Sequence, residues 1–283
     1  MADRPGPTLR RRKLVKELTA AREAAGMTGS LLATEIGLKP SSVSKIEKGI
    51  QGLTVRNIKA YARVTGLSKA KTDELVLLAA NDKTYDDWLV EFREDMPDWF
   101  ALYPALEEDA VQIWTYSSEL VEGLFQTAAY AEAIVRASLP EITGEELERS
   151  IELRSRRQKL LDGDNPPKLR LVLNEAVIRR QIGGETVMAE QIKHLIDLSE
   201  KEQITLQVLP FSAGAHPAMK TGFTLLRFPE GFDDMDCAYL ENENGGVWQE
   251  VLDHVARYSE VFERVSSMAL NPKETTALLA SLV

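Results

Sequence analysis

The chain has 283 residues, carries a formal net charge of −10 and is 44% hydrophobic. This length is sufficient for two domains with sizeable apolar cores. The single cysteine, Cys237, excludes a disulfide framework and a cysteine-rich metal site, which suits a reducing compartment. The N-terminus lacks the apolar run of a signal peptide, and no stretch approaches the roughly 20 apolar residues of a membrane span. We therefore expect a soluble, cytoplasmic protein.

The charge is distributed unevenly along the chain. Residues 1–80 contain 15 Lys and Arg against 7 Asp and Glu, a net charge of +8. Residues 81–283 contain 19 against 37, a net charge of −18. A basic module joined to an acidic one is the asymmetry expected when a DNA-binding domain is fused to a sensor or interaction domain. The sequence therefore predicts a nucleoid-associated protein with its DNA contacts in the first 80 residues.

Short amphipathic helices fill this basic module. Residues 1–8 contain two prolines and a glycine, and we expect a disordered arm. The first helix extends to about Ala25, with Leu14 and Leu18 on its inner face. A second helix carries the apolar stripe of Leu32, Ala33 and Ile36. Fourth and fifth helices follow, with Thr54 and Ser68 as N-caps and Val55, Ile58, Ala62, Leu75, Leu78 and Ala79 as inner residues.

A third helix begins near Ser41, after the turn Gly37–Pro40. Val43, Ile46 and Glu47 form its inner face, whereas Ser41, Ser44, Lys45 and Lys48 recur at helical spacing on its outer face. Hydroxyls and backbone amides at a helix N-terminus can hold phosphate, and lysines beyond them can reach phosphate or guanine acceptors. This pattern predicts a helix-turn-helix, although an ordinary helical hairpin with a solvated polar face fits the same spacing. The predicted DNA-binding residues are Thr28, Lys39, Ser41, Ser42, Ser44, Lys45, Lys48, Arg10, Arg11, Lys13 and Arg56.

The acidic part has a mixed α/β pattern from residue 81 onward. The strongest strand signal is Ile204–Leu209, ended by Pro210. Residues 111–116, 168–173, 222–228 and 237–241 complete a predicted sheet of about five strands. Helices are expected at about 85–94, 104–109, 127–137, 145–161, 175–181, 186–199, 247–268 and 272–282. The fold class is thus multidomain: an all-α five-helix domain at 9–80 and an α/β domain at 81–283.

The acidic part contains no recognisable catalytic or metal-binding motif. Its three histidines are dispersed, there is no phosphate-binding loop or nucleophile elbow, and we expect neither an enzyme nor a cofactor or metal. His216 lies in a loop of small residues, so His216 and Phe223 are candidates for ligand or partner contacts. The arginines at 154, 156 and 157 are expected to face solvent or to pair with Glu148 and Glu152. Contact of Arg154 and Arg157 with an acidic partner is the alternative.

The basic module resembles the Xre-type helix-turn-helix of phage-repressor-like regulators. The resemblance covers roughly residues 9–80 and rests on a Leu-Ala pair, the turn glycine and Ser-x-x-Ser-x-x-Glu-x-Gly. It implies a structural ion pair between Arg22 and Glu47. The family usually has Gln at the start of the second helix, where this chain has Gly29. Base recognition is therefore expected to shift to Ser41, Ser42, Lys45 and Lys48.

The acidic part resembles a domain of unknown function found behind such modules in actinobacterial regulators, the antitoxin-like or WhiJ-like group. The resemblance rests on VEGLFQTAAYA (121–131), Arg157-Gln158, LNEAVIRRQIG (173–183), residues 205–230 and AYLEN (238–242). One departure is Glu122, where the group more often has Pro. The resemblance implies a small partner protein encoded next to the gene.

These observations predict a transcriptional regulator that binds a double-stranded DNA operator as a homodimer and senses a partner protein or a ligand. Such a dimer would place two recognition helices about 34 Å apart on a pseudo-palindrome. The alternative is an antitoxin-like protein that neutralises its small neighbour and binds DNA for autoregulation.

Overall fold

The computed structural model describes residues 9–50, 53–80, 87–97 and 99–283. Contacts divide the chain into two units, Met1–Leu106 and Glu107–Val283. The division falls within the helix Tyr103–Asp109 (α7). The expected arm at residues 1–8 and the expected domain boundary at residue 81 both lie outside the described residues.

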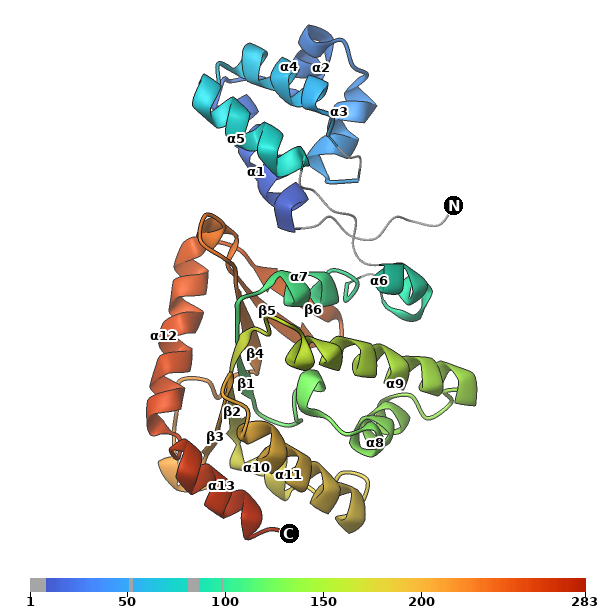
Figure 1. The fold of residues 1–283 in the computed structure, drawn as a ribbon, viewed down its shortest axis with the longest axis vertical. Helices are drawn as coiled ribbons and strands as arrows, with labels where there is room; N and C mark the ends of the chain where they lie inside the picture. The colour runs from blue at the N-terminus through green and yellow to red at the C-terminus, as the bar shows by residue number, and fades with distance from the viewer. Residues whose placement is uncertain (1–8, 51–52, 81–86, 98) are drawn as a thin grey trace. The chain divides into compact units, whose positions relative to one another are not determined.

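The first unit contains the five expected helices, which we call the head, followed by the short helix α6 (Asp87–Glu91) (Figure 1). Its core joins α1 to α5 through fully buried side chains, including Leu14, Leu18, Ile58, Tyr61 and Leu75. Thr54 caps α4 through a bond from the Asn57 backbone, as expected, and Ser68 accepts from Lys71. The head helices are α1 (Leu9–Ala24), α2 (Gly29–Ile36), α3 (Pro40–Glu47), α4 (Val55–Thr65) and α5 (Lys69–Ala80).

One inner residue of the head was predicted wrongly. Val55 is 40% exposed, whereas Tyr61 on the same helix is fully buried. Val55 is the first residue of α4, where the chain enters the helix at the surface and the 3.6-residue period does not yet fix which side faces inward. Ile58, Tyr61 and Ala62 therefore form the buried face of α4.

The second unit is built on a mixed sheet of six strands in the order β3-β2-β1-β4-β5-β6. β1, β2 and β3 run parallel, and β1, β4, β5 and β6 pair antiparallel. The α/β class is confirmed. The strands are β1 (Gln112–Ser117), β2 (Lys168–Asn174), β3 (Ile204–Leu209), β4 (Phe223–Arg227), β5 (Cys237–Asn242) and β6 (Gly245–Gln249).

Helices cover both faces of this sheet (Figure 1). α12 (Leu252–Met268) lies on one face and packs Val255, Phe262 and Val265 against the sheet residues Tyr116 and Leu225. The other face carries α8 (Ala128–Ser138), α9 (Gly144–Gln158), α10 (Glu175–Arg179) and α11 (Glu185–Ser199). α13 (Pro272–Ala280) packs against β3 and α11.

β6 was not predicted from the sequence, from which the last long helix was expected to begin at about residue 247. The structure forms a β5–β6 hairpin there, and α12 begins only at Leu252. A Cβ atom on Gly246 would lie 2.4 Å from the Tyr239 ring. The glycine is therefore a strand residue that lets Tyr239 pack across the hairpin against Trp248, with ring centroids 4.7 Å apart.

Candidate nucleic-acid interface

The turn between α2 and α3 is fixed by local backbone geometry. The Thr28 hydroxyl caps α2 by accepting from the Leu31 backbone at 3.2 Å. Gly37 ends α2 in the left-handed conformation, at φ 71°, which a residue with a side chain rarely adopts. Pro40 then opens α3 at a position that needs no backbone donor. The sequence thus sets the angle at which α3 leaves α2.

α3 has one buried face and one exposed face. Val43 and Ile46 are buried in the head core. The exposed face carries Ser41, Ser44, Lys45 and Lys48, with Ser42 half-buried beside them. A surface hollow of about 520 Å³ lies between this face and the start of α2, lined by Thr28, Gly29, Ser30, Pro40, Ser41, Val43, Ser44, Glu47 and Lys48. The structure therefore brings Thr28, Ser41, Ser44 and Lys48 onto one concave surface.

Arg22 and Glu47 form the expected ion pair between α1 and α3. Arg22 Nε donates to Glu47 Oε1 at 2.6 Å and Nη2 donates to Oε2 at 3.2 Å. Arg22 Nη1 also donates to the Met27 carbonyl, which anchors the segment before α2. The bond to Glu47 raises the pKa of Arg22, and burial raises the pKa of the neighbouring Tyr61 hydroxyl. The pair holds the last turn of α3 against α1.

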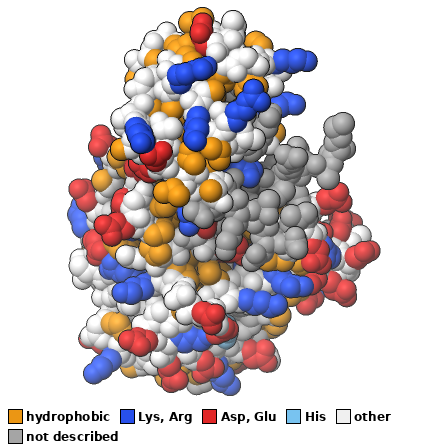
Figure 2. Space-filling model, turned by 45° about the horizontal axis from the view of Figure 1, so that its top comes forward, with side chains coloured by type: hydrophobic (Ala, Val, Ile, Leu, Met, Phe, Trp, Pro, Cys, Tyr) orange, Lys and Arg blue, Asp and Glu red, His pale blue; other side chains and the backbone are white. Residues whose placement is uncertain are grey.

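The outlying basic residues of the head divide into two groups. Lys39, Arg10 and Arg56 are exposed, and Arg11 is half-buried. Lys13 differs from expectation: it is 7% exposed, and its Nζ lies 3.2 Å from Glu17 Oε1. Because the ammonium is shielded and paired one turn along α1, Lys13 is not an exposed cation. Figure 2 shows Lys and Arg side chains gathered on the visible face of the head, with fewer carboxylates.

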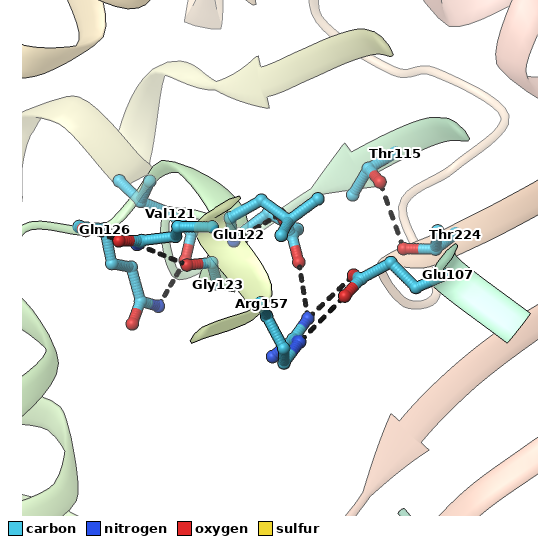
Figure 3. Close-up of polar contacts among 10 residues, drawn as sticks. Glu107, Thr115, Val121, Glu122, Gly123, Gln126, Arg157 and Thr224 are labelled. Atoms are coloured by element: carbon cyan, nitrogen blue, oxygen red, sulfur yellow. Dashed lines mark hydrogen bonds and ion pairs between the residues drawn. The ribbon is translucent and has the colours of Figure 1, made fainter. Parts of the chain in front are cut away.

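In the second unit Arg157 is buried rather than solvent-facing (Figure 3). Its Nε and Nη2 each donate to one oxygen of Glu107 at 2.8 Å, and Nη2 lies 3.6 Å from Glu122 Oε1. Burial raises the pKa of Glu122 to about 7, against the opposing effect of Arg157. Arg156 does pair with Glu152, as expected, at 3.8 Å. The helical period of α9 could not indicate this cluster, because the main partner, Glu107, lies 50 residues earlier in the sequence.

Glutamines continue this polar network around the segment 121–127. Gln158 donates to the carbonyls of Gly123 and Gln126, at 3.1 and 2.7 Å. Gln126 donates to the Val121 carbonyl, and Gln191 from α11 bonds both Phe125 and Thr127. A Cβ atom on Gly123 would lie 3.1 Å from Arg157. These hydrogen bonds fix the turn at residues 121–127 in the core of the second unit. The motif Val121–Ala131 therefore has a structural role.

Arg154, His216 and Phe223 are the other candidate contact residues of the second unit. Arg154 Nη1 donates to Ser150, and burial lowers the pKa of its guanidinium. His216 Nε2 lies 3.4 Å from the Tyr116 hydroxyl, and burial lowers the pKa of His216. Phe223 is buried against Tyr116 and Tyr258. Phe223 is therefore a core residue beneath the loop that carries His216.

Two classes of feature were not found within the described ranges of the chain. They contain no group of three His, Cys, Asp or Glu side chains that could hold a metal ion. None of their helices combines the length and the apolar character needed to cross a membrane.

The head defines the class of protein. Residues 18–71 match a helix-turn-helix family model, and this match together with the exposed face of α3 supports DNA-binding transcriptional regulation. Residues 100–281, more than half of the chain, match the family described as "Domain of unknown function (DUF5753)". The chain belongs to this family. No curated protein and no solved structure matches it.

Proposed function

We propose that this protein is a sequence-specific transcriptional regulator that binds a pseudo-palindromic operator as a homodimer. The observation that carries the proposal is the division of α3 into a buried apolar face and an exposed face of hydroxyls and lysines. A helix of this kind, anchored by a turn of fixed geometry, can enter the major groove with its N-terminal half toward the bases. The domain division proposed from the sequence, 9–80 and 81–283, assigns DNA binding to the first part.

The exposed residues of α3 have different expected roles. Ser41, Ser42 and Lys45 lie on its first two turns, and we assign them to base edges. Phosphate contacts, which give salt-dependent affinity, come from residues around this helix. They are assigned to Thr28, Lys39, Ser44, Lys48, Arg10, Arg11 and Arg56. Lys13 is left out of the set because it is buried against Glu17.

Gly29 supports recognition by α3 rather than by α2. It offers no side chain to the hollow, and a Cβ atom at this position would meet only Val43, at an ordinary distance of 3.8 Å. The wall of the hollow that is formed by the start of α2 therefore consists of backbone and of the side chains of Thr28 and Ser30. Base discrimination then depends on the hydroxyls and the lysine of α3.

Binding of the purified protein to its own upstream intergenic DNA, in a gel-shift salt series, tests this proposal. We expect a complex that survives excess competitor DNA and whose affinity falls steeply with salt, because phosphate neutralisation releases counterions. Equal affinity for the upstream DNA and for a scrambled duplex of the same composition would contradict it.

A second candidate function is binding of a small partner protein, as in the antitoxin-like group. It is favoured by residues 228–256, which contain eight Asp and Glu and neither Lys nor Arg. Within this segment Val247, Val251 and Leu252 are exposed. An apolar patch among carboxylates suits a basic partner.

The sensor function could instead act through a small ligand bound near His216. Thermal shifts of the purified protein across a metabolite panel test this proposal.

Co-expression with the product of any short neighbouring reading frame tests the partner proposal. Co-purification with the native chain, lost in Val251→Lys, is the expected result. Co-purification that Val251→Lys leaves unchanged would exclude this segment as the contact.

A further inference from the structure

Three segments meet where the parallel strands of the second unit end, two loops and the short helix α10. Because β1, β2 and β3 run parallel, their carboxyl ends lie at one edge of the sheet. Residues 118–122 follow β1, α10 follows β2, and the loop 210–221 leads from β3 to β4, on the far side of β1. Leu120, Phe211 and Met219 are exposed on these loops, the last two by 58% and 67%. We call these three residues the carboxyl-edge patch.

The loop that carries Phe211 and Met219 is held in place by hydrogen bonds and close packing. The Phe211 backbone donates to Glu175 Oε2 at 2.7 Å. His216 contacts the Tyr116 hydroxyl at the end of β1. A Cβ atom on Gly222 would lie 2.9 Å from the Tyr116 carbonyl, so the loop returns to the sheet at very close range. The patch is therefore a preformed surface, and a partner docking on it would lose little entropy in ordering the loop.

The charge around the patch differs from the rest of the unit. Residues 107–283 contain 30 Asp and Glu against 17 Lys and Arg, yet residues 210–221 contain no carboxylate and a single lysine, Lys220. The charged neighbours are balanced: Arg180 pairs with Glu119 and Arg179 pairs with Glu175. An apolar surface with balanced charge is where two copies of a strongly acidic unit can approach with the least repulsion.

We propose that the carboxyl-edge patch is the surface on which a second copy of this chain docks. In a two-fold symmetric interface each copy presents the same patch, so Glu119 of one copy can meet Arg180 of the other. Both side chains are more than half exposed and are available for such an exchange. The inference rests on the proposed function in one respect, since a pseudo-palindromic operator requires two heads.

Light scattering coupled to size-exclusion chromatography on the full chain tests the patch. We expect the native chain to be a dimer and the double variant Phe211→Asp/Met219→Asp to be a monomer with an unchanged far-UV spectrum. The matched control is Leu139→Asp, because Leu139, the C-cap residue that follows α8, is 57% exposed and lies outside the patch. A monomeric native chain, or a dimer that persists in the double variant, would overturn the proposal.

Charge reversal gives a second test that does not depend on the apolar residues. Glu119→Arg alone should weaken the dimer through like charges, and Glu119→Arg/Arg180→Glu should restore it. A dimer equally stable in all three proteins would contradict the assigned contact and with it the interface.

The same variants distinguish a failure of the proposed dimer interface from a failure of the proposed DNA recognition. Lys45→Ala should stay dimeric and lose operator preference, whereas Phe211→Asp/Met219→Asp should retain base preference at lower affinity. Specific DNA binding by a protein that is dimeric through another surface would refute the patch and leave the regulator proposal intact.

Discussion

Each unit of the molecule contains an arginine–glutamate pair that joins distant segments, and the two pairs differ in charge balance. In the head, Arg22 of α1 bonds only one partner-helix carboxylate, Glu47 at 2.6 Å. In the second unit, Arg157 of α9 bonds Glu107 through two nitrogens and also lies near Glu122. One guanidinium therefore serves two carboxylates in the second unit.

This difference in balance has a consequence for protonation. A buried carboxylate whose paired cation bonds a second carboxylate more closely is poorly compensated for the loss of water. Glu122 accordingly has a pKa of about 7, raised first by burial and further by Glu107. Arg22 also has a second carboxylate nearby, Glu23 at 3.4 Å, but Glu23 is 66% exposed and stays solvated, and the bond to Glu47 raises the pKa of Arg22. Because Glu122 titrates near neutrality, the Arg157 cluster should respond to pH in that range.

The largest expected effect comes from Arg157→Met. This change leaves Glu107, which is 1% exposed, as a buried charge without its partner. We expect a loss of roughly 3–5 kcal/mol in the free energy of unfolding of the second unit. Urea denaturation followed by tryptophan fluorescence measures it. The control is Arg156→Met on the same helix, whose partner Glu152 is exposed, and it should change stability by less than about 0.5 kcal/mol. Equal losses in the two variants would contradict the buried pair.

A smaller loss is expected from Arg22→Met, because both partners keep partial access to water. The free energy of unfolding of the head should fall by about 3 kcal/mol or less, and that of the second unit should not change. Since the pair fixes the last turn of α3, DNA binding should fall with it. Hydrogen exchange resolved by mass spectrometry distinguishes the two units. Increased exchange in both units would show that the pair is not a local feature of the head.

Glu122→Gln should stabilise the protein above neutral pH. The folded pKa of about 7 lies above the ordinary value of 4.5, so the folded state binds more protons than the unfolded state between these values. Stability of the native chain therefore falls as pH rises from about 4.5 to 7, and the variant lacks this contribution. Melting temperatures should coincide near pH 4.5 and be higher in the variant at pH 8.

The control for this prediction is Glu132→Gln, since Glu132 is exposed on α8 beside Arg136. It should not gain stability at pH 8. A variant Glu122→Gln that is less stable than the native chain at pH 8 would mean that the carboxylate is stabilised by Arg157 and not penalised by burial.

The head could be predicted closely from its sequence because its signals are local. Gly37, Pro40 and Thr54 mark helix ends within a few residues of the backbone groups they affect, and each does so in the structure, whereas the capping role of Thr28 was not predicted. Inner residues followed from the helical period, except at the first residue of α4, Val55. The Arg22–Glu47 pair came from the resemblance and is present.

The second unit was predictable in its elements but not in its polar core. Five strands followed from short apolar or alternating runs. β6 was missed because it begins with two glycines, and Gly246 is required there by the close approach of the Tyr239 ring from the paired strand β5. Arginines on a helix that also carries many glutamates normally indicate a solvated face, so the burial of Arg157 against Glu107 could not be predicted from the sequence. Gln191 gave no signal either, since its bonds reach residues more than 60 positions away.

The central claim is that α3 recognises a DNA sequence, and one comparison tests it most directly. Affinities for the upstream operator and for a scrambled duplex are measured at equal salt for the native chain, Lys45→Ala and Lys273→Ala, an exposed lysine on α13. We predict that discrimination is lost in Lys45→Ala and kept in Lys273→Ala, with both variants as stable as the native chain within about 0.5 kcal/mol. Unchanged discrimination in Lys45→Ala would contradict the account.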